Sequence, residues 1–200
     1  MTTIRVVLAE DNVLLREGVS RLVSGNEDFE LVGVASDLPQ LLDVIKEQDP
    51  DVVITDIRMP PTGSDEGIQA AAWLRANRPR VGVVVLSQYT APGYALALLE
   101  HGSAGRAYLL KERVASVDEL ARAIRTVAQG GSVIDPQVVD ELVRSRSQRR
   151  ASNLSSLTPG SRRYWPRWPR ARATQRSRPP SPSRNGPSRS TQTPSSPSWG

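Results

Sequence analysis

The sequence predicts an α/β protein built on a doubly wound parallel sheet with helices on both faces. Over the first 130 residues, five short apolar runs alternate with amphipathic stretches, which is typical of repeated strand–helix units. Two of these runs, residues 52–54 and 83–86, are continuously apolar. Such runs favour parallel strands that are covered by helices on both faces.

Each expected element follows from the local pattern of apolar residues. Leu15, Val19, Leu22 and Val23 repeat at the helical period, and the stretch from Leu38 to Ile45 does the same. Strands are expected near residues 4–9, 31–35, 52–56, 81–87 and 106–110. Helices are expected near residues 12–25, 38–48, 65–77, 91–102 and 116–129.

The chain divides into three parts. Gly130 and Gly131 end the fifth strand–helix unit, so the predicted domain covers residues 3–130. Residues 131–158 are expected to form a linker that contains a short helix from Pro136 to about Arg149. Residues 159–200 are rich in Arg, Pro and Ser and are expected to be a disordered tail, because they cannot bury enough apolar surface to offset chain entropy.

The formal charge of +5 hides a strong asymmetry. Residues 1–143 contain all 21 acids and 13 of the 26 basic residues, a net charge of −8, whereas residues 144–200 contain 13 arginines and no acid. Such a contrast usually marks a basic arm that binds nucleic acid. The charge boundary near Arg144 therefore agrees with the boundary drawn from the apolar pattern.

Composition also excludes several classes of protein. The chain has no cysteine, and hence no disulfide framework or thiolate metal site, as expected of a cytoplasmic protein. No apolar stretch approaches the length of a membrane span, so a soluble protein without membrane contact is expected. The glycines form neither a dinucleotide-binding fingerprint nor a phosphate-binding loop.

Polar residues with complementary chemistry stand where four of the predicted strands end. Glu10 and Asp11 follow the first strand, and Asp56 ends the third. Ser87 and Lys111 end the fourth and fifth. The carboxyl ends of parallel strands form the crevice in which open α/β sheets bind ligands, so these groups are expected to converge. Any one of them alone would more often cap a helix, but the set indicates a phosphoryl-transfer site.

This set resembles the receiver domain of bacterial two-component response regulators. The resemblance rests on Glu10-Asp11, on Asp56 followed by Met59-Pro60, on Ser87, and on Lys111 preceded by Tyr108, and it covers residues 3–130. Residues 15–18 and 108–112 are similar to the NarL/FixJ (LuxR-type) subfamily in particular. The resemblance implies a flavodoxin-like sheet of five strands in the order 2-1-3-4-5.

The expected chemistry centres on three carboxylates. Glu10, Asp11 and Asp56 would repel one another and would bind a hard cation such as Mg²⁺, for which the resemblance adds the backbone carbonyl of Arg58. Asp56 would accept a phosphoryl group from a cognate sensor histidine kinase, with Lys111 neutralising charge. This is self-phosphorylating receiver chemistry, so we do not expect an enzyme that turns over a separate substrate.

The resemblance also implies a conformational switch and an oligomer. Ser87, where many relatives carry Thr, would contact the new phosphoryl oxygen, and Tyr108 would rotate inward. A homodimer through the helices near 91–102 and 116–129 is possible.

A haloacid-dehalogenase-type phosphatase also uses a strand-end aspartate, but it needs an acid two residues later, where this chain has Arg58.

The tail interrupts the expected design. Receivers of this subfamily lead into a helix-turn-helix domain that opens with Leu-Thr-Pro, and Leu157-Thr158-Pro159 stands at the right distance. Codons compatible with the residues from Gly160 onward, read one nucleotide earlier, can encode a LuxR-type helix-turn-helix. We therefore interpret the tail as an out-of-frame remnant and expect no sequence-specific DNA binding. The alternative is a functional basic arm that binds nucleic acid without sequence specificity and still regulates transcription.

Overall fold

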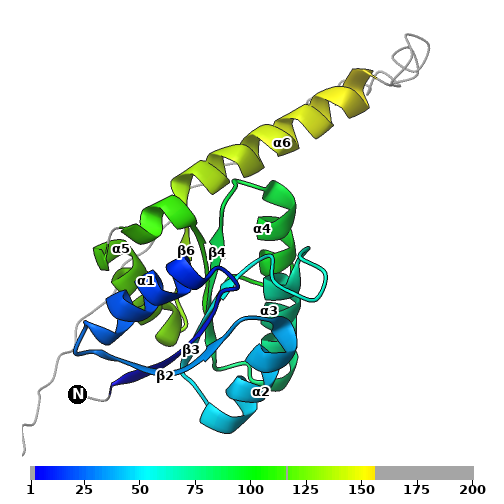
Figure 1. Ribbon diagram of the computed structural model, residues 1–200. Helices are drawn as coiled ribbons and strands as arrows, with labels where there is room; N and C mark the ends of the chain where they lie inside the picture. The colour runs from blue at the N-terminus through cyan, green and yellow to red at the C-terminus, as the bar shows by residue number, and fades with distance from the viewer. Residues whose placement is uncertain (1–2, 116, 156–200) are drawn as a thin grey trace, which may run out of the picture. The chain divides into compact units, whose positions relative to one another are not determined.

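A parallel β-sheet forms the middle layer of the protein (Figure 1). The computed structural model describes residues 3–115 and 117–155. The strand order is β2-β1-β3-β4-β5-β6, and every neighbouring pair is parallel. The strands are β1 (Ile4–Ala9), β2 (Phe29–Ala35), β3 (Val52–Asp56), β4 (Gly82–Ser87), β5 (Arg106–Leu110) and β6 (Ser132–Ile134).

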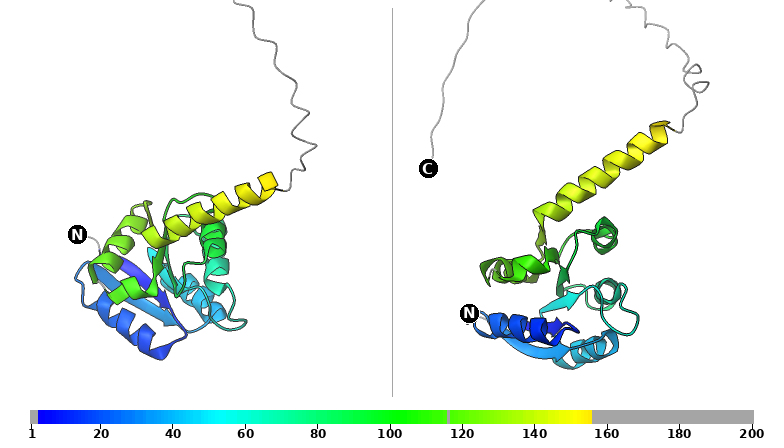
Figure 2. Two further views of the ribbon diagram at one scale, coloured as in Figure 1. Left: turned by 90° about the horizontal axis from the view of Figure 1, so that it is seen from above. Right: turned by 45° about the horizontal axis from the view of Figure 1, so that its top comes forward.

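Helices cover both faces of this sheet (Figure 2). One face carries α1 (Val13–Ser24) and α5 (Val117–Ala128), and the other carries α2 (Leu38–Gln48), α3 (Glu66–Asn77) and α4 (Pro92–Leu99). A short 3-10 helix, η1 (Lys111–Ala115), follows β5, and α6 (Pro136–Ser155) follows β6. The predicted doubly wound α/β fold is therefore confirmed.

Two hydrophobic cores lie on opposite faces of the sheet. Alternate residues of each strand point to opposite faces, so Val83 and Val85 join the core under α2, α3 and α4, whereas Val84 and Leu86 join the core under α1 and α5. All residues of β3 and β4 are buried. This burial confirms the interpretation of the two continuously apolar runs as central strands.

The sheet has six strands, so the predicted number of five is wrong. The additional strand, β6, pairs with the outer edge of β5, where Arg106 lies opposite Ser132 and Tyr108 opposite Ile134. Three residues are too few to show a periodic pattern, and the preceding Gly130 and Gly131 indicated only a break. The order of the first five strands is as predicted.

Other boundaries differ by a few residues. β2 begins at Phe29 rather than near residue 31, and α4 ends at Leu99 rather than near residue 102. The expected linker helix is present as α6 but extends to Ser155, beyond the predicted end near Arg149. The expectations for Leu157-Thr158-Pro159 and for the tail at 159–200 concern residues outside the described part of the chain.

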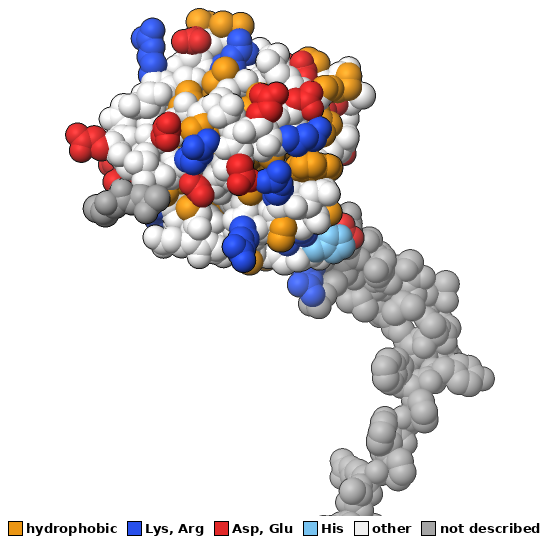
Figure 3. All heavy atoms as spheres, turned by 90° about the horizontal axis from the view of Figure 1, so that it is seen from below, with side chains coloured by type: hydrophobic (Ala, Val, Ile, Leu, Met, Phe, Trp, Pro, Cys, Tyr) orange, Lys and Arg blue, Asp and Glu red, His pale blue; other side chains and the backbone are white. Residues whose placement is uncertain are grey.

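The described surface carries mixed charge. On the face shown in Figure 3, acidic and basic side chains alternate, and hydrophobic side chains lie between them singly or in small groups. Among the described residues, every helix is too short or too polar to cross a lipid bilayer.

Candidate phosphoacceptor site

Three carboxylates meet at the carboxyl edge of the sheet. Glu10 follows β1 and is fully buried, Asp56 ends β3 and is 7% exposed, and Asp11 is exposed. One oxygen from each of them lies within 4.8 Å of the others. The neighbouring pairing of β1 with β3 produces this convergence, because it brings the ends of the two strands side by side.

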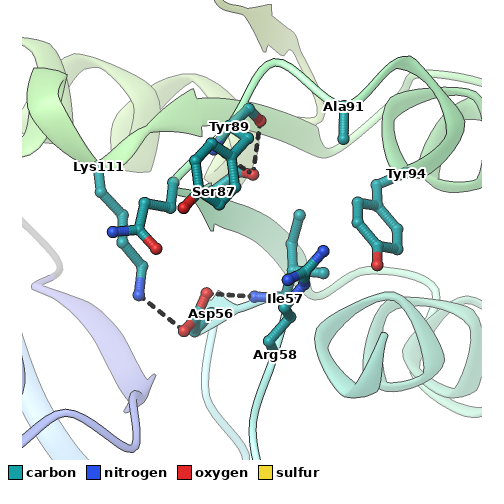
Figure 4. A pocket seen from close by; sticks show the side chains of 9 residues that line it. Asp56, Ile57, Arg58, Ser87, Tyr89, Ala91, Tyr94 and Lys111 are labelled. Carbon is teal, nitrogen blue, oxygen red and sulfur yellow. Dashed lines mark hydrogen bonds and ion pairs between the residues drawn. The ribbon is translucent and has the colours of Figure 1, made fainter. Parts of the chain in front are cut away.

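Lys111 reaches this cluster from the end of β5. Its Nζ donates to Asp56 Oδ2 at 2.7 Å and lies 3.0 Å from Glu10 Oε1 and 2.9 Å from Glu10 Oε2. The other oxygen of Asp56, Oδ1, accepts a hydrogen bond of 2.7 Å from the backbone N–H of Ile57 (Figure 4). The Asp56 carboxylate is thus held by one donor on each oxygen.

Burial and charge act against each other at these groups. Burial raises the pKa of Glu10, and the nearby charge of Asp56 raises it further, while Lys111 opposes both. Burial would lower the pKa of Lys111, but its hydrogen bonds to Asp56 and Glu10 outweigh this effect, so its pKa is raised. Lys111 is therefore firmly cationic at neutral pH.

The cluster fits a divalent metal ion. Three carboxylates and one ammonium carry a net charge of −2 when the acids are ionised. Glu10 Oε2 is buried and accepts no hydrogen bond, although it lies close to Lys111 Nζ. Carboxylate oxygens are the ligands that Mg²⁺ prefers, and it binds through one or two of them. Glu10, Asp11 and Asp56 could therefore hold this ion.

Ser87 and Tyr108 share one backbone acceptor beside the site. Ser87 Oγ donates to the carbonyl oxygen of Tyr89 at 2.8 Å, and the Tyr108 hydroxyl donates to the same oxygen at 3.3 Å. Ser87 is 4% exposed and Tyr108 is fully buried, which raises the pKa of the Tyr108 hydroxyl. The tyrosine that was expected to rotate inward is already inside in this structure.

A glycine lets α3 approach the end of β3. A Cβ atom at Gly67 would lie 2.0 Å from the carbonyl oxygen of Asp56 and 3.0 Å from Ile57 Cα. The Gly67 N–H donates to the carbonyl oxygen of Ile57 at 2.9 Å. Any side chain at this position would therefore displace the backbone that carries Asp56.

Glu66 holds the loop between β3 and α3. Its buried carboxylate accepts hydrogen bonds from the backbone N–H groups of Thr62 and Ser64, each at 2.9 Å, and from the Thr62 hydroxyl. Burial alone would raise the pKa of Glu66, but these hydrogen bonds lower it to about 2. Glu66 is therefore an ionised structural residue.

A pocket of about 290 Å³ opens beside Asp56. Tyr94 of α4 stands at one side, with its hydroxyl donating to the Ser64 carbonyl oxygen at 3.0 Å, and the Arg58 guanidinium lies 5.9 Å from the centre of its ring (Figure 4). The pocket gives a small charged group access to the Asp56 carboxylate. It is lined by Asp56, Ile57, Arg58, Ser87, Gln88, Tyr89, Ala91, Tyr94 and Lys111.

The structure brings together every side chain that the sequence predicted for the site. Glu10, Asp11, Asp56 and Lys111 form one cluster, and Ser87 lines the same pocket as Asp56. Their chemical roles remain predictions, as does the carbonyl of Arg58 as a metal ligand. Sequence reasoning missed Glu66, Gly67 and Tyr94, because acids and glycines at a helix start are common and Tyr94 reads as an ordinary helix residue.

Comparisons with known proteins agree with this geometry. Residues 6–125 match the model of the response regulator receiver domain family. The chain is 36% identical over 141 residues to the transcriptional regulatory protein DegU of Brevibacillus brevis, covering 70% of this chain and 57% of that protein. It is also 36% identical over 148 residues to the probable transcriptional regulatory protein NarL of Mycobacterium tuberculosis, covering 74% of this chain and 65% of that protein.

A solved structure extends the likeness to three dimensions. The signal receiver domain of the putative response regulator NarL from Mycobacterium tuberculosis superposes with a TM-score of 0.57 and 35% sequence identity. The match covers 65% of this chain and 99% of that one. The alignments with DegU and NarL span only 57–65% of those proteins.

Proposed function

The chain belongs to the response regulator receiver family, with NarL/LuxR-type regulators among its relatives, and on this premise we propose that Asp56 is its phosphoacceptor. One observation carries the proposal. Asp56 is the acid that ends a central strand, opens onto the pocket and pairs directly with Lys111 at 2.7 Å. The phosphoryl donor would be the phosphohistidine of a cognate sensor kinase.

The proposed reaction forms one bond and breaks one. A carboxylate oxygen of Asp56 attacks the phosphorus atom, and the bond between phosphorus and the histidine nitrogen of the donor breaks. The electron pair of that bond stays on the histidine nitrogen. The hydrogen bond from the Ile57 N–H fixes the orientation of the carboxylate, so the attacking oxygen is positioned before the donor arrives.

Charge neutralisation is the main task of the surrounding residues. The Lys111 ammonium can move from the ionised Asp56 to a phosphoryl oxygen, because it sits within hydrogen-bond distance of the carboxylate that reacts. A Mg²⁺ ion held by Glu10, Asp11 and Asp56 would screen the negative charges of the acid and the phosphoryl group. The chain thus acts as the acceptor in a phosphorelay and does not turn over a separate substrate.

The phosphorylated state would be read through Ser87 and Tyr108. A phosphoryl oxygen on Asp56 would compete with the Tyr89 carbonyl for the Ser87 hydroxyl, since both acceptors lie along the same pocket wall. Loss of that hydrogen bond frees the loop after β4, which also holds the Tyr108 hydroxyl. The switch is therefore a local exchange of hydrogen-bond partners that alters the loop before α4.

Labelling with a small acyl phosphate tests the assignment. We expect incorporation of phosphate into the full chain only when Mg²⁺ is present, and loss of all incorporation in Asp56→Ala. Glu30→Gln is the matched control, because it removes an exposed acid on β2 and should label normally. Labelling of Asp56→Ala at the wild-type level would refute the assignment, and labelling in the presence of a chelator would refute the role of the metal.

The output of this receiver is a separate proposal. DegU and NarL are named as transcriptional regulators, and we propose that the ancestral protein was one too, acting in the cytoplasm. We expect the chain as it stands to bind DNA weakly, without sequence preference, and less tightly as salt rises. Gel-shift competition with unrelated DNA checks this. Protection of a defined operator against excess competitor would favour the alternative, a functional basic tail.

A further inference from the structure

An apolar groove lies between α4 and α6. Val138 is fully buried and Leu142 packs against the same core, so the first turns of α6 are fixed to the body of the domain. The groove beside them has a volume of about 420 Å³ and is open to solvent, because Leu96 of α4 is 50% exposed and Val143 of α6 is 61% exposed. It is lined by Leu96, Val139, Leu142, Val143, Ser145 and Arg146.

The composition of α4 indicates that this groove is a docking surface. All eight residues of α4 are uncharged, and the Tyr94 hydroxyl is the only polar side-chain group among them. A helix that is apolar on every side is normally buried. Leu96 and Ala97 of α4 nevertheless stay exposed, although α3 and α6 both pack against this helix. The described part of the chain therefore leaves an apolar patch in water, as is typical of a surface that binds a partner.

The shape of the groove favours a helix as that partner. Val139, Val143 and Arg146 follow one another at intervals of four and three residues, so they form a row about 10 Å long on one face of α6. Leu96 borders this row from α4, and past this contact α6 continues away from the sheet (Figures 1 and 2). The apolar stripe of an amphipathic helix repeats at the same intervals. An extended peptide would instead need the open backbone edge of a sheet, which two helices do not offer.

The charges beside the groove indicate that the partner is acidic. Arg146 lies in the groove lining and is exposed. Among the described residues, the ion pair within α6 joins Glu141 to Arg144, and Arg146 has no carboxylate partner. From residue 144 to its end at residue 155, α6 contains four arginines and no acid, whereas its two acids, Asp140 and Glu141, precede this half. Acidic side chains of a partner would therefore be attracted to the second half of α6.

We propose that this groove binds an acidic amphipathic helix of another protein, with its apolar stripe against Leu96, Val139 and Val143 and its carboxylates beside Arg146. A nucleic acid would neutralise the arginines but leave the apolar side chains uncovered. A second copy of α6 would bring further arginines next to Arg146, which is unfavourable. The groove and the pocket at Asp56 share no lining residue, so the proposal does not depend on phosphorylation.

Fluorescence anisotropy with synthetic peptides tests this proposal on the full chain. The probe is a labelled helical peptide of about 18 residues, with Leu at intervals of three and four residues and Glu on both sides of that stripe. A scrambled peptide of the same composition is the control, because its equal charge reports attraction to the arginines of residues 144–200 alone. We expect the probe to bind in the micromolar range, about ten-fold more tightly than the scrambled peptide.

Substitutions in the groove identify the surface that the probe uses. Leu96→Ser and Val143→Ser should each weaken binding of the probe by about ten-fold, because each removes an apolar contact. Leu14→Ser is the matched control, since Leu14 is 85% exposed on α1, and it should bind normally. Arg146→Glu should also weaken binding by about ten-fold, whereas Arg122→Glu, at an exposed position of α5, should not.

Each contrary result assigns a different role to this surface. Equal binding of the probe and the scrambled peptide, or equal binding of the probe by wild type and Val143→Ser, would overturn the proposal. Binding of a DNA duplex that is lost in Arg146→Glu but kept in Val143→Ser, with no preference for the probe, would indicate a nucleic-acid surface instead. A wild-type chain that self-associates without peptide, and sediments as a monomer once Val143 is replaced by Ser, would show that a second copy covers the groove.

Discussion

The cluster at the carboxyl edge of the sheet and the edge formed by β6 and α6 are stabilised in different ways. At the cluster, burial and short hydrogen bonds fix Glu10, Asp56 and Lys111, as in the contacts of Lys111 with the two acids. At the other edge, β6 has only three residues, and α6 is attached mainly through Val138, Leu142 and the cap at Asp135. We therefore expect the first region to tolerate few substitutions and the second to depend on weaker, replaceable contacts.

The difference has a physical origin. A buried charge that loses its partner costs several kcal/mol, whereas an apolar contact or a helix cap costs about 1 kcal/mol each. The chemistry of the domain is therefore specified by individual residue identities. The position of α6 is specified by the sum of modest interactions, which can change without unfolding the sheet.

The largest effect should come from Lys111. We expect Lys111→Met to lower the rate of phosphorylation by about 10²–10³, because the substitution keeps the length of the side chain and removes the charge that stabilises the reacting oxygens. Rapid-mixing labelling with an acyl phosphate measures this rate. Arg113→Met, two residues along in η1, is the matched control and should retain the wild-type rate. Equal rates in wild type and Lys111→Met would contradict the assigned role.

The second-largest effect is expected for Gly67→Ala, which should lower the free energy of unfolding by about 3 kcal/mol. The added Cβ would lie 2.0 Å from the Asp56 carbonyl oxygen, so α3 or the end of β3 must move. Gly18→Ala is the control, because no atom outside the local backbone of α1 lies within 4 Å of its Cβ position, and it should stabilise the protein by about 0.5–1 kcal/mol. Urea denaturation distinguishes the two. A stable Gly67→Ala would show that the backbone at Asp56 is free to shift.

Glu66 gives a smaller effect that depends on pH. Its pKa is about 2 in the folded protein, below the usual value of 4.5, so its contribution to stability is present above about pH 4.5 and is lost as the pH falls toward 2. Glu66→Gln should lower stability at neutral pH by about 1–3 kcal/mol and should flatten this acid dependence. Urea denaturation at a series of pH values measures both. Parallel pH profiles for the two proteins would disprove the prediction.

The smallest effect is expected at the α6 edge. Asp135 Oδ1 accepts a hydrogen bond of 2.9 Å from the Gln137 N–H at the start of α6, and Oδ2 lies 3.4 Å from Arg113 Nε of η1. Asp135→Ala should destabilise the chain by about 1 kcal/mol and increase hydrogen exchange in α6. Phosphate labelling of Asp56 should be unchanged, because none of the carboxylate cluster contacts Asp135. A loss of labelling would show that the two regions are coupled more tightly than their contacts indicate.

Most of the fold and the convergence of the strand-end side chains at one site could be predicted from the sequence. Strand-end acids, a strand-end lysine and continuous apolar runs are local patterns, and the geometry of parallel strands converts them into one site. Asp56 and Lys111 are 55 residues apart in the chain, yet each is recognisable from its own strand.

The parts that were missed depend on contacts without a local pattern. β6 is defined by pairing with β5, and nothing in Ser132-Val133-Ile134 alone distinguishes it from a linker. Glu66 and Gly67 acquire their importance only because α3 returns to the end of β3. The far end of α6 was underestimated because its polar sequence lacks an apolar stripe past Val143.

The attachment of α6 at one end makes it a lever. Asp135 ties the start of the helix to both η1 and β5, since its own N–H donates to the Tyr108 carbonyl oxygen at 2.9 Å. Twenty helical residues extend about 30 Å, so a tilt of about 5° at Asp135 would carry the far end through about 2.6 Å. A small displacement of η1 next to Lys111, one that leaves the sheet packing unchanged, would thus move the far end of α6 by more than the length of a covalent bond.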